Sequence, residues 1–482
     1  MSRQRFVVIG GGITGLAAAH RLVELREEKK ADFDILLLEA ENRLGGVMGT
    51  DYRNGFVLEW GPDSFISEKP WAFRLADRIG LTPHLVRTND EHRRNFVVYD
   101  GRLHPLPDGF LMMAPTQFLP LVQSSLFSLP GKLRMGLDLV LPRGGTGGDE
   151  SLGSFVTRRL GREALERVVQ PLVGGIYTAD PDQLSLQATM PRFLEMERQN
   201  RSVIATMWRQ ARAMAAAQKG PAKPMSGARW SLFVSVDRGM QGLVDAIAQR
   251  LPEESVRVGC AVKALQRSQR WQVITAAGES IDADGLVLAP PAHVAARLLE
   301  PLDPASAADL RDTPYTSSAT VSLAFRRDQV PDALDGFGFV VPRVERRGII
   351  ACTYSSVKYP GRAPAGHVLL RAFIGGAFQE ELAKQDEERM VESVRRELQQ
   401  LLRIDEPPSF TNIHRHHQAM PQYKVGHLER LERVEKRLQQ LPGLYLAGNG
   451  YRGVGVPDCI HSGESAAETL VSSAPSHLRT ET

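Results

Sequence analysis

The chain has 482 residues, of which 42% are hydrophobic and 24% are charged. This composition excludes a largely disordered chain, a collagen-like repeat and a small disulfide scaffold, and the length predicts about two to four domains. Because 59 basic and 56 acidic residues leave a net charge of only +3, we expect no nucleic-acid partner. Three cysteines without a CxxC pair indicate a reducing compartment and no structural zinc site.

Apolar runs in the sequence are short or interrupted, so they indicate neither a signal peptide nor a membrane-spanning helix. Residues 6–9 are too few for the apolar core of a signal peptide. The longest uncharged stretch, residues 109–131, contains prolines, glutamines and serines, so we expect no membrane-spanning helix. The sequence therefore predicts a cytoplasmic protein. Residues 110–113 and 118–119 favour a pocket wall or core and leave a peripheral membrane contact open.

The predicted elements follow one another without an internal repeat. The first 50 residues predict a strand, a glycine turn, a helix and a second strand, and helical patterns fill much of residues 66–230. The later elements are strands at 256–258, 271–275, 285–289, 319–325 and 368–374, a charged helix at 385–402, a strand at 444–447 and a helix at 463–471.

A GxGxxG pattern at Gly10, Gly12 and Gly15 follows the first strand, with Gly11, Ile13 and Thr14 at the intervening positions. Gly10 allows a tight turn, Gly12 lets the backbone approach a pyrophosphate, and Gly15 lets the helix pack on the strand. The free N–H groups and positive dipole at the helix start then favour phosphate. The alternative, a chance glycine-rich turn, is less consistent with this order of elements.

Glu39 ends the second predicted strand, 24 residues after Gly15. An acidic residue at this place binds ribose hydroxyls and disfavours a 2′-phosphate. The sequence therefore predicts a dinucleotide site that does not take NADP.

The segment Glu39-Ala40-Glu41-Asn42-Arg43-Leu44-Gly45-Gly46 continues this pattern. Its Glu-Ala-x-x-Arg-x-Gly-Gly motif resembles the flavin-dependent oxidases of the amine-oxidase superfamily, whose dinucleotide is FAD. The resemblance implies that Ala40, Arg43, Gly45 and Gly46 line the FAD site. Without it, Arg43 would read as a surface ion-pair partner and the glycines as a turn.

The C-terminal segment around Gly453-Val454-Gly455-Val456-Pro457-Asp458-Cys459-Ile460 predicts a second glycine turn between a strand and a helix. It resembles a narrower branch, the porphyrinogen oxidases of haem biosynthesis, in which this backbone runs beside the flavin ring. We interpret Asp458 as a helix cap rather than an acid catalyst. Cys459 is interpreted as a packed thiol.

Further segments resemble the same branch in chain order. They include Gly61-Pro62-Asp63-Ser64 at the cofactor, Val262 at the adenine, Gly175-Ile-Tyr177, Gly336-Phe-Gly338, Met420-Pro-Gln-Tyr423 and Val425-Gly-His427. Two positions depart from the family: His416 stands where many members have Trp, and Thr178-Ala179 replaces Ala-Gly. The resemblance implies that His416 lies at the cofactor, and the departure from Trp puts this contact in doubt. The second departure concerns pocket shape.

This resemblance implies an α/β fold with a discontinuous Rossmann-like FAD-binding domain, a mixed-sheet substrate domain and an inserted helical domain. We expect the FAD-binding domain to comprise residues 1–85, 230–300 and 415–482. Residues 86–229 would form the helical domain over the active site, and residues 301–414 the substrate domain.

The implied reaction is the six-electron oxidation of a porphyrinogen to a porphyrin with O2 as acceptor. Because the cofactor supplies the chemistry, we expect no catalytic side chain and no metal. His414, His416 and His417 form a cluster, but they lack a matched acid or cysteine, and we favour structural roles for them.

Coproporphyrinogen III has four propionates and protoporphyrinogen IX has two, so the first requires more cationic partners. Many protoporphyrinogen oxidases carry Arg where this chain has Asn95, whereas Lys69 after Gly-Pro-Asp-Ser is typical of the coproporphyrinogen enzymes. We therefore favour coproporphyrinogen III and keep protoporphyrinogen IX as the alternative. The residues that the resemblance implies at the substrate are Lys69, Arg93, Asn95, Gly175, Val340 and Tyr359.

Two more distant hypotheses remain. An amine oxidase or carotenoid desaturase of the same superfamily would need an aromatic cage or a longer apolar tunnel. A binding protein that makes no use of flavin would share the fold, because fold does not fix function. Both a monomer and a homodimer stay open.

Overall fold

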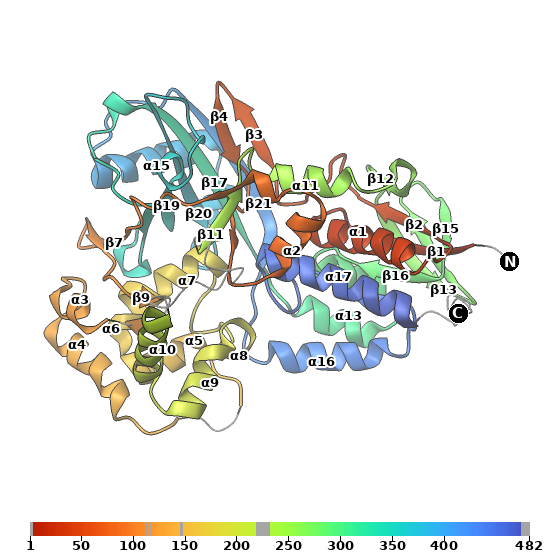
Figure 1. Cartoon of the computed structure of the whole chain (residues 1–482), viewed down its shortest axis with the longest axis horizontal. Coiled ribbons are helices and arrows are strands. Elements are labelled where there is room, and N and C mark those ends of the chain that lie inside the picture. Colours follow the sequence, from red (N-terminus) through yellow and green to blue (C-terminus); the bar gives the residue numbers. More distant parts are fainter. Residues whose placement is uncertain (1–2, 112–113, 116, 145–147, 218–231, 474–482) are drawn as a thin grey trace.

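The computed structural model describes residues 3–473 apart from 112–113, 116, 145–147 and 218–231. Figure 1 shows three groups of elements: a parallel sheet with helices near both termini, a large sheet backed by α15, and a lobe of helices. In the described part of the chain, no helix is both long and apolar enough to cross a membrane.

A five-stranded parallel sheet forms the core of the first group. Residues 6–9 of its central strand are buried on both faces, which explains their continuous apolar run. Its strands, in spatial order, are β12 (Val256–Arg257), β2 (Phe33–Leu38), β1 (Gln4–Ile9), β16 (Gly285–Leu288) and β22 (Leu444–Leu446).

Two helices from opposite ends of the chain, α1 (Ile13–Glu28) and α17 (Val456–Ser473), lie side by side against this sheet (Figure 1). A Cβ on Gly463 would lie 2.2 Å from the carbonyl oxygen of Thr14, so the two backbones cross where only glycine fits. The strands and helices therefore come from three separated stretches of sequence. The predicted discontinuous Rossmann-like fold is confirmed.

A seven-stranded sheet forms the second group, and α15 (Glu387–Leu402) packs on it through Met390, Val394 and Leu398. Its strands, in spatial order, are β21 (Phe410–Pro421), β17 (Tyr315–Arg326), β20 (His367–Gly375), β19 (Ala351–Tyr354), β18 (Gly338–Val340), β7 (Asn95–Tyr99) and β8 (Arg102–Pro105). The pairing of β18 with β7 is parallel and the other pairings are antiparallel, so the predicted mixed sheet is confirmed.

The third group is the helical lobe. Its helices share one apolar core that includes Phe155, Val168 and Phe193. They are α3 (Phe118–Gln123), α4 (Leu129–Gly136), η2 (Leu137–Leu139), α5 (Leu152–Leu160), α6 (Arg162–Ala164), the π-helical η3 (Leu165–Val169), α7 (Gln170–Tyr177), α8 (Leu186–Thr189), α9 (Pro191–Asn200) and α10 (Val203–Ala217).

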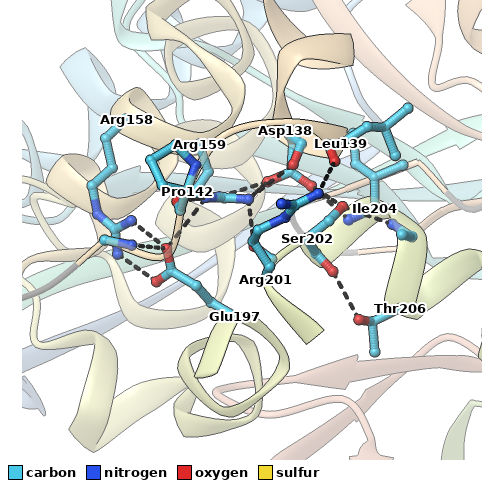
Figure 2. A network of polar contacts seen from close by, with 12 residues as sticks. Asp138, Leu139, Pro142, Arg158, Arg159, Glu197, Arg201, Ser202, Ile204 and Thr206 are labelled. Carbon is cyan, nitrogen blue, oxygen red and sulfur yellow. Dashed lines mark hydrogen bonds and ion pairs between the residues drawn. The ribbon is translucent and has the colours of Figure 1, made fainter. Parts of the chain in front are cut away.

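A buried ionic network ties these helices together (Figure 2). Arg159 of α5 and Asp138 of η2 are 1% and 0% exposed, and the Arg159 Nε donates to Asp138 Oδ1 over 2.6 Å. The second carboxylate oxygen of Asp138 accepts from the Ser202 hydroxyl over 2.6 Å. Glu197 of α9 pairs with Arg158 over 2.5 Å. Charged side chains thus join α5, α9 and η2 inside the lobe.

The remaining elements connect these groups or line their edges. The strands are β3 (Thr50–Arg53), β4 (Phe56–Glu59), β5 (Phe65–Ile66), β6 (Leu85–Arg87), β9 (Phe110–Leu111), β10 (Ala114–Pro115), β11 (Phe233–Val236), β13 (Val262–Arg267), β14 (Trp271–Thr275) and β15 (Ser280–Ala283). The helices are α2 (Trp71–Arg78), η1 (Thr82–His84), α11 (Gln241–Ala248), η4 (Glu253–Ser255), α12 (Ala292–Leu299), α13 (Pro304–Arg311), η5 (Arg327–Gln329), η6 (Arg343–Glu345), α14 (Ser355–Lys358), η7 (Glu380–Lys384) and α16 (His427–Leu438).

The domain boundaries stay a prediction, with two differences in detail. Residues 95–105, which we expected in the helical domain, form β7 and β8 of the seven-stranded sheet. The reason is that β7 pairs with β8 on one side and with β18 on the other. β21 runs across the boundary expected after residue 414. The boundary between residues 229 and 230 lies outside the described residues.

Candidate active site

The glycine turn after β1 has the backbone geometry expected of a phosphate-binding loop. Gly10 has φ +105°, in the region that favours glycine, and its N–H donates to the Leu38 carbonyl over 2.8 Å. A Cβ on Gly15 would lie 1.8 Å from the Gly10 carbonyl oxygen, so the first turn of α1 packs directly on the loop. Gly10 and Gly15 therefore shape the turn itself.

Gly12 differs from its neighbours because a Cβ there would meet no described atom within 4 Å. Gly12 is the N-cap of α1, and no described side chain caps the helix. The N–H groups of the first turn, including those of Ile13 and Thr14, therefore stay available to an anion. Gly46 lies across from Gly12, and its Cβ would be 3.4 Å from the Gly12 Cα. This open cradle fits a pyrophosphate.

Glu39 lies at the end of β2 beside this cradle. Its carboxylate is buried and accepts the Gly11 N–H over 2.5 Å and the Glu41 N–H over 2.8 Å. The Cys260 N–H donates to the Glu39 carbonyl over 2.7 Å, which brings the start of β13, with Val262, alongside. The residues expected at the ribose and the adenine thus come from neighbouring segments.

Arg43 closes the other end of the cradle. Its guanidinium donates to the carbonyl of Gly46 over 2.7 Å and to that of Met48, and it stacks 4.3 Å from the centre of the Trp60 ring. Gly45 has φ +108°, and its N–H donates to the Gly11 carbonyl over 2.8 Å. Burial lowers the pKa of Arg43. Arg43 therefore holds the backbone from Gly46 to Met48 rather than forming the surface ion pair of the alternative interpretation.

The Gly61–Ser64 segment carries a buried charge cluster. Asp63 accepts from the Lys358 ammonium over 2.9 Å, and the Arg371 guanidinium donates to the carbonyls of Trp60, over 2.9 Å, and Gly61. Burial alone would raise the pKa of Asp63, but Lys358 and Arg371 outweigh it and hold the pKa well below its usual value. A fixed positive charge thus lies behind the Gly61–Pro62 backbone.

His416 lies beside the same backbone. Its Nε2 donates to the Trp60 carbonyl over 2.9 Å, and the ring would be 3.6 Å from a Cβ on Gly61. Burial lowers its pKa, so the ring is neutral at neutral pH. His414 stacks on Trp60 and pairs with Asp51 over 2.8 Å. These contacts give both histidines structural partners.

The glycine turn after β22 leads into α17. Gly453 has φ +142°, and a Cβ there would lie 2.5 Å from the Asp458 side chain, so glycine is required. Asp458 lies in the first turn of α17, where its charge suits the helix dipole, and Lys69 Nζ contacts its two oxygens over 2.6 and 2.7 Å. Burial raises the pKa of the Cys459 thiol to about 12, as expected of a packed cysteine.

Two residues that hold this turn carried no role in the sequence interpretation. The hydroxyl of Tyr423 accepts the Gly453 N–H over 3.0 Å and donates to the Asn449 carbonyl. His427 Nε2 donates to the Tyr451 carbonyl over 2.7 Å. Both lie in segments that family resemblance had already singled out, and the residues alone gave no signal that they contact residues 449–453.

The substrate side is assembled only in part. Gly175 of α7 faces Val340 of β18, whose Cγ1 would be 3.9 Å from a Cβ on Gly175. Val340 and Val454 both pack against the core of the helical lobe. The predicted macrocycle contact and the segment expected at the flavin therefore both border the helical lobe.

The other predicted substrate residues are engaged elsewhere. Tyr359 is 1% exposed and lies near Asp63, and its contact with the macrocycle stays a prediction. Arg93 is exposed and pairs with Asp90 over 3.0 Å, and Asn95 begins β7 at the surface. The Arg93–Asp90 pair joins residues only three positions apart, whereas the burial of Tyr359 depends on tertiary packing that local sequence does not encode.

Comparison with known proteins supports the dinucleotide-binding class of protein that the glycine cradle indicates. The family model "Flavin containing amine oxidoreductase" matches residues 13–471. The chain belongs to this family, which confirms the expected superfamily and its flavin cofactor.

Relatives narrow the class further. The chain is 36% identical over 466 residues to the coproporphyrinogen III oxidase of Bacillus subtilis (strain 168), covering 96% of this chain and 97% of the relative. It is 30% identical over 481 residues to the chloroplastic protoporphyrinogen oxidase of Nicotiana tabacum, covering 96% and 85%. A solved structure from Exiguobacterium sp. 255-15, provisionally named a protoporphyrinogen oxidase, has TM-score 0.84, 33% identity and coverage of 98% and 99%.

Proposed function

We propose that the chain is an FAD-dependent oxidase that converts coproporphyrinogen III to coproporphyrin III with O2 as the acceptor. The observation that carries this proposal is the similarity to the B. subtilis coproporphyrinogen III oxidase along nearly the whole of both chains. The open cradle at Gly12, which a dinucleotide pyrophosphate fits, supports FAD as the form of the flavin.

The chain's own residues bind and orient. The first turn of α1 holds the pyrophosphate, Glu39 receives the ribose, and Arg43 keeps the Gly45–Gly46 backbone in place. When bound, FAD supplies the redox chemistry by accepting electron pairs from the substrate. The backbone at Gly61–Pro62 and at Gly453–Val456 would border the flavin ring.

The electron count fixes the stoichiometry. Conversion of a porphyrinogen to a porphyrin removes six electrons and six protons, and three O2 molecules would carry them away as three H2O2. The described residues thus need only exclude side reactions and hold the macrocycle, for which Gly175 and Val340 provide an apolar wall.

Protoporphyrinogen IX is the alternative substrate, because the tobacco relative and the Exiguobacterium structure carry that name. Lys69 favours coproporphyrinogen III if its ammonium, 43% exposed beside Asp458, reaches a propionate. This pairing with Asp458 also competes with that role.

The test offers each porphyrinogen, prepared without oxygen, to the purified holoenzyme, and then admits O2. Porphyrin fluorescence and H2O2 are followed together. We expect higher kcat/KM with coproporphyrinogen III and three H2O2 per porphyrin. A clear preference for protoporphyrinogen IX would overturn the substrate assignment, and no turnover of either would overturn the function.

We also propose a cytoplasmic location with peripheral contact to an anionic membrane surface. Exposed leucines and valines occur on and next to α3, α4 and η2. The helices α3 and α4 lie at the outer end of the helical lobe (Figure 1). Leu129 and Leu133, one turn apart on α4, are 71% and 66% exposed. This apolar face comprises Leu119, Val122, Leu129, Leu133, Leu137 and Val140.

Charge favours a lipid surface as the occupant of this face. Between Asp108 and Asp149 the sequence has one acidic residue, Asp138, and it is fully buried. The same stretch contains Lys132, Arg134 and Arg143, and none of the three forms an ion pair with a described acid. Lys132 and Arg134 belong to the same helix as Leu129 and Leu133, and cations beside an exposed apolar face suit anionic headgroups.

Vesicle sedimentation tests this contact. The double variant Leu129→Ser/Leu133→Ser should bind phosphatidylglycerol vesicles at least about tenfold more weakly than the parent protein, because it lacks two leucines that the bound vesicle would cover. Val258→Ser/Val344→Ser removes exposed valines elsewhere and serves as the control. Equal binding by the leucine variant and the parent protein would contradict the proposal. A parent protein that does not bind the vesicles and self-associates through this face would contradict it as well.

A further inference from the structure

Residues 422–427, here called the strap, comprise the short connection after β21 and the first residue of α16. The strap runs between the helical lobe and residues 448–453, here called the flavin loop. It belongs to two segments that resemble the porphyrinogen oxidases and for which the resemblance implied no role.

Two buried side chains of the strap hold the flavin loop. The Tyr423 hydroxyl bridges both ends of the loop, because it accepts the Gly453 N–H over 3.0 Å and donates to the Asn449 carbonyl. His427 Nε2 donates to the carbonyl of Tyr451 in the middle of the loop, over 2.7 Å. The Tyr423 and His427 rings stack with their centres 4.1 Å apart, and they are 1% and 0% exposed.

The backbone of the strap is bound to the helical lobe. The Ser185 N–H donates to the Tyr423 carbonyl over 2.7 Å, and the Val425 N–H donates to the Gln183 carbonyl over 3.0 Å. Asp149 joins the two sides, since one oxygen accepts the Gly426 N–H and the other the Ser185 hydroxyl, each over 2.9 Å. The strap is therefore hydrogen-bonded to both structures.

We propose that Tyr423 and His427 are positioning residues for the flavin, and that the strap couples the flavin loop to the helical lobe. In the described part of the chain, residues 449–453 form no backbone–backbone hydrogen bond, and the Gly448 N–H donates to the Ser462 hydroxyl over 3.0 Å. The backbone geometry of the loop therefore depends on side chains, among them Tyr423 and His427. Groups that orient a binding shell from behind change affinity without touching the ligand. The inference rests on the proposed function, because it needs a flavin beside the loop.

The flavin loop offers a matched pair of variants. Tyr423→Phe removes the bridging hydroxyl and leaves the Gly453 N–H and Asn449 carbonyl without it. Tyr451→Phe removes a hydroxyl that is buried in the same loop and has no hydrogen-bond partner among the described residues. Stacking and packing volume are preserved in both.

The readouts are the Kd of FAD for the apoprotein and the visible circular dichroism of the flavin at saturation. For Tyr423→Phe we expect about a tenfold higher Kd and an altered flavin spectrum, and for Tyr451→Phe less than about a twofold change. If Tyr423→Phe lowers the melting temperature of the apoprotein but leaves the Kd and the spectrum unchanged, the residue is merely structural and the proposal is wrong.

The coupling of the flavin loop to the helical lobe is tested by a substitution in the lobe, at Asp149. Asp149→Ala removes the hydrogen bonds to Ser185 and Gly426, and should raise the Kd of FAD about threefold to tenfold. Glu166→Ala is the control, because Glu166 is a lobe carboxylate whose ion pair is with Arg162 on the surface. An unchanged Kd in Asp149→Ala would overturn the coupling.

The outcomes separate this inference from the proposed function. If the parent protein binds no FAD, the proposed function fails and the inference fails with it. If the parent protein binds FAD and oxidises a porphyrinogen while the Tyr423 and Asp149 variants bind FAD equally well, only the inference fails.

Discussion

The parallel-sheet half and the helical lobe are held together in different ways. In the sheet half, backbone groups and glycines build the site, as at Gly12, where an added Cβ would have no described atom within 4 Å. In the lobe, buried charged side chains join the helices, as Arg159 and Asp138 do. A site made of backbone is sensitive to added volume, whereas a lobe whose helices are joined by buried ion pairs is sensitive to lost charge.

Gly12→Val should cause the largest effect in the sheet half. Its Cβ meets no described protein atom and Gly12 has φ −68°, so we expect a folded protein that retains no flavin. Flavin absorbance and circular dichroism measure the two properties. Gly15→Val is the counterpart, because a Cβ there would lie 1.8 Å from the Gly10 carbonyl oxygen and should prevent folding. Retained flavin in Gly12→Val would refute this placement of the pyrophosphate.

Arg159→Met should cause the largest effect in the lobe. It leaves the Asp138 carboxylate buried without its cation, which costs about 3–5 kcal/mol of the free energy of unfolding. Denaturant unfolding measures the loss. Arg162→Met removes an exposed pair with Glu166 and should cause no measurable change. Similar stability of the two variants would erase the contrast between buried and surface pairs.

Acid should lower the stability of the fold through His427. Burial lowers the pKa of His427 from 6.5 to about 4. The hydrogen bond to the Tyr451 carbonyl and the charge of Asp149 oppose this shift, and Arg430 and Arg452 add to it. The unfolded chain therefore binds the proton first, so this stabilisation is complete above about pH 6.5 and is lost as the pH falls toward 4. Unfolding midpoints between pH 7 and about 4 measure it.

His427→Asn is the control for this pH dependence, because an amide can donate to the Tyr451 carbonyl but does not titrate. We expect its stability to fall less steeply with acid. Some slope should remain, because burial also lowers the pKa values of His20 and His416. If the stability of His427→Asn falls with acid as steeply as that of the parent protein, His427 does not contribute to the pH dependence.

Lys69→Ala should have a smaller effect, on KM. If Lys69 binds a propionate, KM for coproporphyrinogen III should rise about fivefold, and less for protoporphyrinogen IX. Arg93→Ala removes an exposed cation already paired with Asp90 and should change neither. Equal, small effects of both variants would indicate that Lys69 serves only to hold Asp458.

Local constraints made much of the fold and cofactor site predictable. Gly10 and Gly15 are required by backbone geometry within a few residues of the turn, and the apolar run of residues 6–9 belongs to a strand buried on both faces. The pairing of Lys69 with Asp458 spans 389 positions and depends on the assembled fold. Burial of Tyr359 behind Asp63 is likewise set by tertiary packing, which no local pattern encodes.

Anaerobic mixing of the oxidised holoenzyme with coproporphyrinogen III tests the central claim most directly. Without O2, electrons from the substrate remain on the cofactor, so the flavin absorbance band should bleach in step with the appearance of oxidised tetrapyrrole. Bleaching should be slower with protoporphyrinogen IX. A flavin band that stays oxidised with both substrates would contradict the account.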